Sequence, residues 1–245
     1  MKRALPIVAL GLLAAGCGGG GNARVAQPPP TIRPSTTTVA TTVEQPLSLE
    51  LFFLAPDGKL VAASRDVAHT QTPGASTLRE LVDPPANMTT RVPDDLQLAI
   101  DAGRANVTGA PLDEAALAQI VYSLTSFATV QSVNGKTRAD VEDFAPAILV
   151  EHPTPGEEVT TPLRVTGTAN TFEATFNYRL EDAQGNALTK SFVTATSGSG
   201  TRGTFDFTVP FTIASAQDGT LAVFELSAED GSVIHERDIP LRLAP

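Results

Sequence analysis

Hydrophobic and polar residues alternate over much of the chain after residue 46, and short runs of turn residues interrupt the alternation. Residues 47–54 (LSLELFFL) and 60–67 (LVAASRDV) are strand-like runs on either side of Pro56-Asp57-Gly58. Proline presets φ for a turn, and glycine accepts a positive φ. The two runs therefore predict a β-hairpin.

A short helix is predicted next. Thr77 and Glu80 fit a capping box, in which two side chains satisfy N–H groups at the start of a helix. We expect this helix to continue through Val82 and to end at Pro84 and Pro85, because proline cannot continue a helix.

The strongest helical signal lies over residues 113–124. Asp113 and Glu114 place negative charge where the N-terminus of a helix favours it. Apolar residues then fall on one helical face: Leu117, Ile120, Val121 and Leu124. We expect this face to pack on a sheet.

Strand-like segments flank this helix. Residues 96–100 (LQLAI) precede it, and residues 130–133 follow it and lead into an Asn134-Gly135 turn. The predicted order is strand, strand, helix, strand, strand, helix, strand. Residues 47–145 therefore predict an α+β domain, an antiparallel sheet with one main and one short helix.

Residues 146–245 show strand signals alone, separated by turn residues at the spacing of a β-sandwich. About seven runs are predicted, and the alternation is clearest where Ala174, Phe176, Tyr178 and Leu180 share one face. We expect an all-β domain with most of the chain's aromatic residues in its core: Phe172, Phe176, Tyr178, Phe192, Phe205, Phe207, Phe211 and Phe224.

The start of the chain resembles a leader. Two basic residues precede an apolar run over residues 4–15, which is typical of a secretory signal and is shorter than the roughly 20 residues that a bilayer core needs. The small residues Ala14, Ala15 and Gly16 follow, as a signal peptidase requires at its cleavage site. We expect a signal peptide over residues 1–16, with cleavage between Gly16 and Cys17.

Cys17 is the only cysteine, so an intrachain disulfide is excluded. Its setting resembles the lipobox of bacterial lipoproteins, although Ala14 stands where leucine is commoner. The resemblance implies a membrane anchor through lipidated Cys17 on the extracytoplasmic face; the alternative is a free secreted thiol. Residues 17–46 are rich in glycine, proline and threonine and predict an unfolded tether.

Both predicted domains resemble known families. The segments LFFLAPDGKLVAASRDV, TLRELVDPP and AALAQIVYSLTSFATVQSV, followed by NGK, are similar to the GerM-type (GerMN) domain of sporulation and germination proteins. This resemblance spans residues 47–144, and Asp83-Pro84 stands where members often have Gly-Pro. It implies the same α+β fold.

The segment HPTPGEEVTTPLRVTGTANTFEATF, with Asp230-Gly231-Ser232 later, resembles the immunoglobulin-like domain associated with bacterial spore germination. This resemblance covers residues 148–243. It implies an immunoglobulin-like sandwich over residues 146–245, behind a GerM-type domain and a lipobox. Neither family is known as an enzyme.

The chain is acidic, with 17 Lys and Arg against 27 Asp and Glu and a formal net charge of −10. Such a charge repels phosphate backbones, so nucleic acid is excluded as a partner. Solubility accounts for the acidity, and recruitment of a basic ligand is the alternative.

Two motifs with possible chemistry have plainer interpretations. Residues 198–203 (GSGTRG) fit G-x-G-x-x-G, but they lie between strands instead of opening a helix, so we expect a mobile hairpin loop. His69, His152 and His235 lack companions at metal-ligand spacing and are expected to be structural or solvated, unless folding gathers them.

Catalytic residues are not visible in the sequence. It holds no G-x-S-x-G motif, and Cys17 is assigned to the anchor. Acidic pairs are expected in turns or at strand ends, as solvated carboxylates: Asp94-Asp95, Glu157-Glu158, Glu181-Asp182 and Glu229-Asp230. We therefore expect no catalytic, cofactor or metal site.

These features favour a lipid-anchored, non-catalytic adaptor of the cell envelope that binds another envelope protein or the cell wall through strand edges and loops. A carbohydrate-binding module is the first alternative, although sugars stack on exposed Trp or Tyr and this chain has no Trp and two Tyr on faces expected to be buried. A wall-polymer hydrolase is the second alternative, and it requires convergent carboxylates in a cleft.

Overall fold

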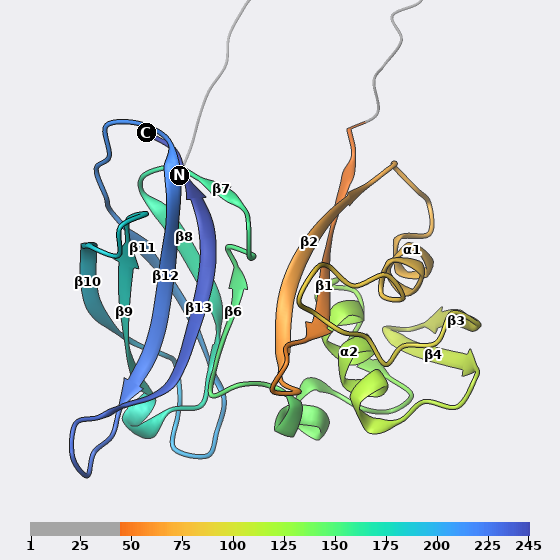
Figure 1. The fold of residues 1–245 in the computed structure, drawn as a ribbon. Helices are drawn as coiled ribbons and strands as arrows, with labels where there is room; N and C mark the ends of the chain where they lie inside the picture. Colours follow the sequence, from red (N-terminus) through yellow and green to blue (C-terminus); the bar gives the residue numbers. More distant parts are fainter. Residues whose placement is uncertain (1–44) are drawn as a thin grey trace, which may run out of the picture. The chain divides into compact units, whose positions relative to one another are not determined.

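The computed structural model describes residues 45–245, so the predicted signal peptide, Cys17 and nearly all of the tether lie outside the described residues (Figure 1). Strands β1 (Leu47–Leu54) and β2 (Leu60–Val67) pair antiparallel and open the described part. The predicted hairpin is confirmed. Within these residues no helix is long and apolar enough to span a bilayer.

Helix α1 (Pro73–Glu80) begins earlier than predicted. Pro73 lies in its first turn, where the fixed φ of proline suits a helix. Thr77 is buried inside the helix, and its hydroxyl donates to the carbonyl of Pro73 at 3.1 Å. The predicted capping box of Thr77 and Glu80 is therefore wrong, because this threonine bonds back to the preceding turn.

Helix α2 (Glu114–Leu124) begins where predicted. The carboxylate of Asp113 accepts a hydrogen bond from the N–H of Ala116 at 2.8 Å, and this bond lowers the pKa of Asp113. Ile120 and Leu124 on the predicted apolar face are fully buried. The local signals of charge and periodicity placed this helix correctly.

A second small sheet contains β3 (Leu96–Asp101), β4 (Arg104–Gly109) and β5 (Ser132–Val133), in that order. Ala102 and Gly103 join β3 to β4 in a two-residue turn with positive φ values of 46° and 80°. The sequence predicted one antiparallel sheet, whereas the structure has two separate sheets and a parallel β4–β5 pair. The parallel pair arises because α2 is the crossover between β4 and β5.

The first hydrophobic core lies where α2 packs against β1. The rings of Phe52 on β1 and Tyr122 on α2 are buried, with their centroids 5.3 Å apart. The hydroxyl of Ser123 accepts from the N–H of Phe52 at 2.9 Å, and the Gln119 side chain donates to the carbonyl of Phe52 at 3.1 Å. Helix α2 therefore satisfies main-chain groups on the free edge of β1 as well as packing on it.

The rest of the described chain is largely β, as predicted. Its strands are β6 (Ile148–His152), β7 (Glu158–Val159), β8 (Leu163–Ala169), β9 (Thr175–Glu181), β10 (Ala187–Thr194), β11 (Gly203–Val209), β12 (Gln217–Leu226) and β13 (Val233–Leu243). They form two sheets, in the orders β10-β9-β12-β13-β7 and β11-β8-β6. The α+β part followed by a β part confirms the predicted fold class. Strand β7 is additional, because two residues are too few to show alternation.

Two aromatic residues assigned to the second core are exposed instead. Phe192 is 66% exposed on the edge strand β10, and Phe172 is 57% exposed in the connection from β8 to β9. Ala174, predicted on a strand face, lies with Phe172 in a short 3-10 helix and has a φ of 59°. The rings that pack together inside are those of Phe176, Tyr178, Phe205 and Phe207.

Strand β6 contributes to both cores. Ile148 and Val150 belong to the second core, whereas Leu149 packs in the first. A 3-10 helix, η1 (Arg138–Phe144), which the sequence did not predict, leads into β6. By their contacts all described residues belong to one unit, and the predicted domain boundary at residues 145 and 146 stays a prediction.

Candidate functional site

Charged and polar groups converge around Arg138, at the start of η1. Its guanidinium donates to Glu151 on β6 at 2.6 Å, to the hydroxyl of Thr125 at 2.9 Å and to the carbonyl of Tyr122 at 3.0 Å. It also lies 4.7 Å from the ring centroid of Tyr122, within cation–π distance. Arg138 therefore joins the end of α2 to the first strand of the second core.

A second carboxylate, Glu50 on β1, lies beside this ion pair. The pKa of Glu50 is raised from 4.5 to about 7; burial is the largest cause, the charge of Glu151 also raises it, and Arg138 lowers it. One carboxylate oxygen of Glu50, Oε1, is buried with no hydrogen-bond partner among the described residues. Glu50 is therefore a carboxyl group that titrates near neutral pH, whereas Glu151 is held by Arg138.

An open cavity of about 550 Å³ lies against this cluster. Hydroxyl and amide groups share its lining with the charged groups: Glu50, Thr125, Ser126, Gln131, Thr137, Arg138 and Glu151. Such a lining suits a hydrated polar group. A retaining or inverting glycosidase needs two carboxyl groups that act as a pair, and here Arg138 engages one of the two.

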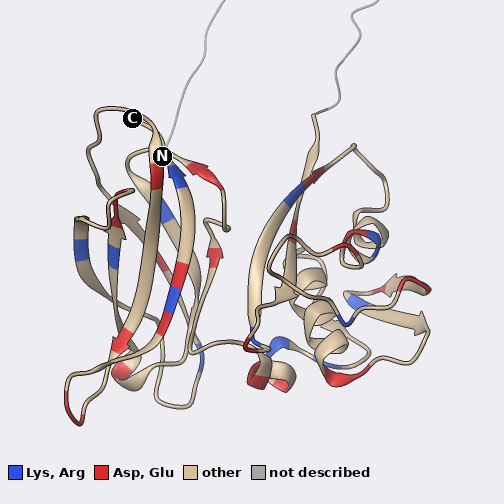
Figure 2. Cartoon of the chain, in the orientation of Figure 1, with Lys and Arg blue, Asp and Glu red and all other residues tan. Residues whose placement is uncertain are grey.

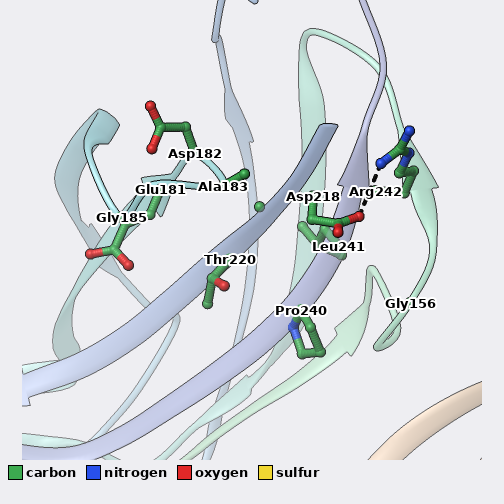
Figure 3. Close-up of a pocket in the computed structure, with 11 residues that line it drawn as sticks. Gly156, Glu181, Asp182, Ala183, Gly185, Asp218, Thr220, Pro240, Leu241 and Arg242 are labelled. Carbon is green, nitrogen blue, oxygen red and sulfur yellow. Dashed lines mark hydrogen bonds and ion pairs between the residues drawn. The ribbon is translucent and has the colours of Figure 1, made fainter. Parts of the chain in front are cut away.

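A cavity of about 470 Å³ lies at one end of the β part (Figure 3). Its charged groups are occupied locally: Arg242 donates to Asp218 at 3.0 Å, and Asp182 accepts from Asn186. The Asn186 side chain and N–H lower the pKa of Asp182. Figure 3 shows Asp182 apart from the Asp218–Arg242 pair, so these carboxylates do not converge on one point.

The structure does not gather the three histidines. Nδ1 of His152 lies 3.4 Å from Glu157, and Nδ1 of His235 lies 2.9 Å from the buried carboxylate of Glu225. In residues 45–245 no group of three or more His, Cys, Asp and Glu side chains is arranged to hold a metal ion. Cys17 and Gly16, the predicted lipid-attachment and cleavage residues, lie outside the described residues.

The glycine-rich residues 198–203 connect β10 to β11, as predicted, but these strands belong to different sheets. The prediction of a hairpin is therefore wrong. A Cβ at Gly198 would lie 2.5 Å from backbone atoms of Ala174, so close backbone packing explains this glycine. Glu181 and Asp182 lie at a strand end as expected, and Asp230 accepts the N–H of Ser232 in a turn.

Sequence reasoning missed the cluster of Glu50, Arg138 and Glu151. The three residues come from β1, η1 and β6, and Glu50 on β1 is far in the chain from the other two. One signal was available, because Glu50 is the single charged residue within the apolar run LSLELFFL. An acid in a strand that is buried on most of its positions predicts a perturbed carboxyl group.

Two family models match the chain. One, described as sporulation and spore germination (Germane), matches residues 50–134. The other, described as the immunoglobulin-like domain of bacterial spore germination (Gmad2), matches residues 147–232. The chain joins a Germane domain to a Gmad2 domain. Both predicted domain resemblances are confirmed, and neither family is known as catalytic.

Two solved structures are similar to parts of this Germane–Gmad2 chain. The tandem GerMN domains of the sporulation protein GerM from Bacillus subtilis are 13% identical, with a TM-score of 0.33, and the match covers 67% of this chain and 61% of that one. CopC from Methylosinus trichosporium OB3b is 13% identical, with a TM-score of 0.25, over 40% of this chain and 94% of that one. The chain thus spans about three fifths of the GerM structure. No curated protein matches it.

Within these matches, Glu50 is the first residue of the Germane range and Glu151 lies in the Gmad2 range. Arg138 lies between the two ranges. The ion pair of Arg138 and Glu151 therefore connects the segment between the domains to the Gmad2 domain.

Proposed function

We propose that this Germane–Gmad2 protein is a non-catalytic adaptor of the cell envelope. It is anchored on the extracytoplasmic face by lipidated Cys17, and it binds another envelope protein or the cell-wall polymer. The observation that carries the proposal is the joining of two domains from families not known as catalytic. Function then depends on surfaces and not on a reaction.

The charge pairing in the described cavities supports this proposal. Arg138 holds Glu151, and Arg242 holds Asp218. Both carboxylates are therefore already engaged in ion pairs within the chain. These side chains are suited to fixing the fold.

A carbohydrate-binding module is the second candidate. The chain has no Trp, and both Tyr122 and Tyr178 are buried. Phe172 and Phe192 are the exposed rings on which a sugar would stack. If this candidate is right, replacing both residues with serine would abolish retention of the full-length chain on insoluble wall polymer. If the chain is an adaptor that binds an envelope protein, the replacement should not change its retention.

Crosslinking in intact cells tests the adaptor directly. The full-length chain is crosslinked in its native envelope, and the captured species are identified by mass spectrometry. One reproducible envelope protein or wall fragment supports the proposal. Capture of nothing beyond what an unrelated lipoprotein of equal abundance captures would refute it.

The anchor is tested at Cys17. We expect Cys17→Ala to release the chain from membranes, because lipid chains on Cys17 are the proposed attachment. Mass spectrometry of the amino-terminal peptide should show a diacylglyceryl modification on Cys17 of the wild-type chain. An unmodified thiol there would contradict the anchor and leave the domain assignments unaffected.

A hydrolase is tested with Glu50, the carboxyl group whose pKa lies nearest neutrality. The full-length chain is incubated with cell-wall polymer, and released fragments are measured. We expect no release. Release that disappears in Glu50→Gln would overturn the adaptor proposal.

A further inference from the structure

Main-chain groups on the sides of β1 and β4 that face away from their hairpin partners are bonded to other parts of the domain. On β1, the main-chain groups of Phe52 bond to Gln119 and Ser123, and those of Leu54 bond to Thr89. On β4, the Asn134 side chain accepts from the N–H of Val107 at 2.8 Å and donates to its carbonyl at 3.0 Å. The outward main-chain groups of these residues on β1 and β4 therefore have hydrogen-bond partners within the domain.

The outer edge of β3 lacks such partners. The two-residue turn makes Asp101 and Arg104 the hydrogen-bonded pair beside it, so bonded and non-bonded pairs then alternate along the hairpin. The bonding of Val107 to Asn134 agrees with this alternation, because Val107 faces away from its partner Leu98. The N–H and C=O groups of Leu98 and Ile100 therefore face outward, away from β4.

Among residues 45–245 no hydrogen bond is formed by these outward groups of Leu98 and Ile100. Figure 1 shows β3 as the outer strand of its sheet, on the side of α1. A strand with a free edge is a template for a further strand, because an extended main chain supplies the missing donors and acceptors.

An apolar groove lies beside this edge. It has a volume of about 320 Å³ between α1 and β3, and Arg79 and Asp94 are the charged residues in its lining. Its apolar lining comprises Ala75, Leu78, Val82, Pro93, Leu96 and Leu98. Ile100, on the same face of β3 as Leu98, is 48% exposed. Alternate side chains of an added strand would enter this groove.

Negative charge at one end of β3 favours a basic residue in a segment that binds at this edge. Asp94 and Asp95 are exposed before β3, and neither makes an ion pair within the described part of the chain. Figure 2 shows acidic residues at both ends of β3, and at the far end Arg104 lies opposite Asp101. Arg79 offsets one charge, which leaves the Asp94–Asp95 end net acidic.

We propose that the free edge of β3 binds an extended peptide segment of the partner, with alternating apolar side chains in the groove beside α1 and a Lys or Arg beside Asp94 and Asp95. This inference rests on the proposed adaptor function and names the kind of partner it takes, a protein. The main-chain ladder supplies affinity, and the groove and the two carboxylates supply selectivity.

The first experiment repeats the crosslinking in cells with edge variants of the full-length chain. Ile100→Pro removes one outward N–H, and proline is tolerated on an edge strand where that N–H faces solvent. Ile100→Ala is the matched control, since it keeps the N–H. We expect Ile100→Pro to lose the partner at least tenfold and Ile100→Ala to lose it less than threefold.

The outcomes separate the inference from the proposed function. Capture of the partner equally by wild type and Ile100→Pro would refute the β3 site and leave the adaptor standing. Capture of nothing by wild type would refute both. Capture of wall polymer alone, insensitive to Ile100→Pro, would also overturn the peptide assignment.

A second experiment uses a defined probe with the full-length chain purified in detergent. The probe is the acetylated and amidated octapeptide Lys-Thr-Val-Thr-Val-Thr-Val-Lys, and its counterpart carries Glu at both ends. We expect saturable binding of the Lys peptide, weakened at least fivefold by Asp94→Lys with Asp95→Lys. Asp94→Lys alone should already weaken binding, and Glu229→Lys, which makes the same change of charge at an exposed acid in the Gmad2 domain, is its matched control and should leave binding unchanged.

If Ile100→Pro does not fold, the β3 site can still be tested by hydrogen exchange on the wild-type chain. Addition of the Lys peptide should slow amide hydrogen exchange at Leu98 and Ile100 at least tenfold. Unchanged exchange at these two amides, or equal binding of the Glu peptide, would overturn the proposal. Self-association that protects the same amides without peptide would assign the edge to a second copy and overturn it as well.

Discussion

Glu50 shows how one side chain links the fold to pH. Its pKa is raised from 4.5 to about 7, first by burial and then by Glu151. Between these two pH values the folded chain holds a proton that the unfolded chain has lost. The stabilising contribution of this proton is therefore complete below pH 4.5 and is lost as the pH rises through 7.

We predict that Glu50→Gln raises stability at pH 8, because glutamine resembles the protonated carboxyl and carries no buried charge. The expected gain in the free energy of unfolding is about 1–3 kcal/mol, since each unit of pKa shift corresponds to about 1.4 kcal/mol. At pH 4 the two proteins should be nearly equal. Urea unfolding at both pH values measures the difference.

Glu158→Gln is the control for Glu50→Gln, because it makes the same substitution at an exposed glutamate. It should leave the pH dependence of unfolding as in the wild type. A Glu50→Gln variant that loses stability at pH 8 would show that the ionised carboxylate is bound favourably by Arg138, against the direction argued above.

For single residues, the sequence predicts those roles that depend on residues nearby in the chain. Asp113 was identified as the start of α2, because a cap depends on residues within one turn. The role of Thr77 is predicted wrongly, because threonine occurs both at helix N-termini and inside helices. Here α1 already begins at Pro73, so Thr77 lies inside the helix. The convergence of Glu50 with Arg138 and Glu151 brings β1 to the distant segment of η1 and β6, so no local rule finds it.

Among the elements, β1 and α2 depend on each other for hydrogen bonds. The side chain of Gln119 is fully buried; it donates to the carbonyl of Phe52 and accepts from the N–H of Arg91 at 2.8 Å. This single glutamine therefore closes the edge of β1 and holds the segment that precedes β3.

We predict that Gln119→Leu lowers the free energy of unfolding by about 3 kcal/mol, because it leaves two main-chain groups without partners. Gln184→Leu, in an exposed turn, should change it by less than about 0.5 kcal/mol. Chemical denaturation measures both. Equal stability of the two variants would show that water replaces the glutamine.

Element prediction succeeded where the runs were long. The β1–β2 hairpin and α2 were found, and β5 lies within the strand predicted over residues 130–133, whereas β7 has two residues and carries no alternation. The β10–β11 connection was taken for a hairpin because sequence neighbours commonly pair, but a sandwich also needs connections that pass from one sheet to the other.

For the whole molecule, the open question is how far the two cores depend on each other. Leu149 is 2% exposed and packs in the first core, although it lies in β6. Separation at residue 145 exposes this side chain and removes the Arg138–Glu151 pair.

We predict that residues 47–145 and 146–245, expressed separately, each unfold cooperatively. The first half should be less stable than the same domain in the full chain by about 2 kcal/mol, the value of burying one leucine. Calorimetry of each half and of the full chain measures this. A half with no cooperative transition would show that the two cores form a single folding unit.

The fold class was predictable at this scale because periodicity changes from mixed to strand-only near residue 146. The dual role of β6 was not, since alternation shows that Leu149 and its neighbours face opposite sides but does not show that both sides are buried. A strand that is buried on both faces has consecutive apolar residues. In β6 these are the residues ILV at its start.

The unpaired edge of β3 also bears on colloidal behaviour. Identical chains at high concentration would meet edge to edge, and an unpaired strand edge favours aggregation. The net charge of −10 makes copies repel one another, so the acidity that seemed a general solubility feature acts here as a barrier against self-templating. Because ions screen that repulsion over about 10 Å at 0.1 M salt, the ionic strength of the solution sets the protein concentration at which copies begin to associate.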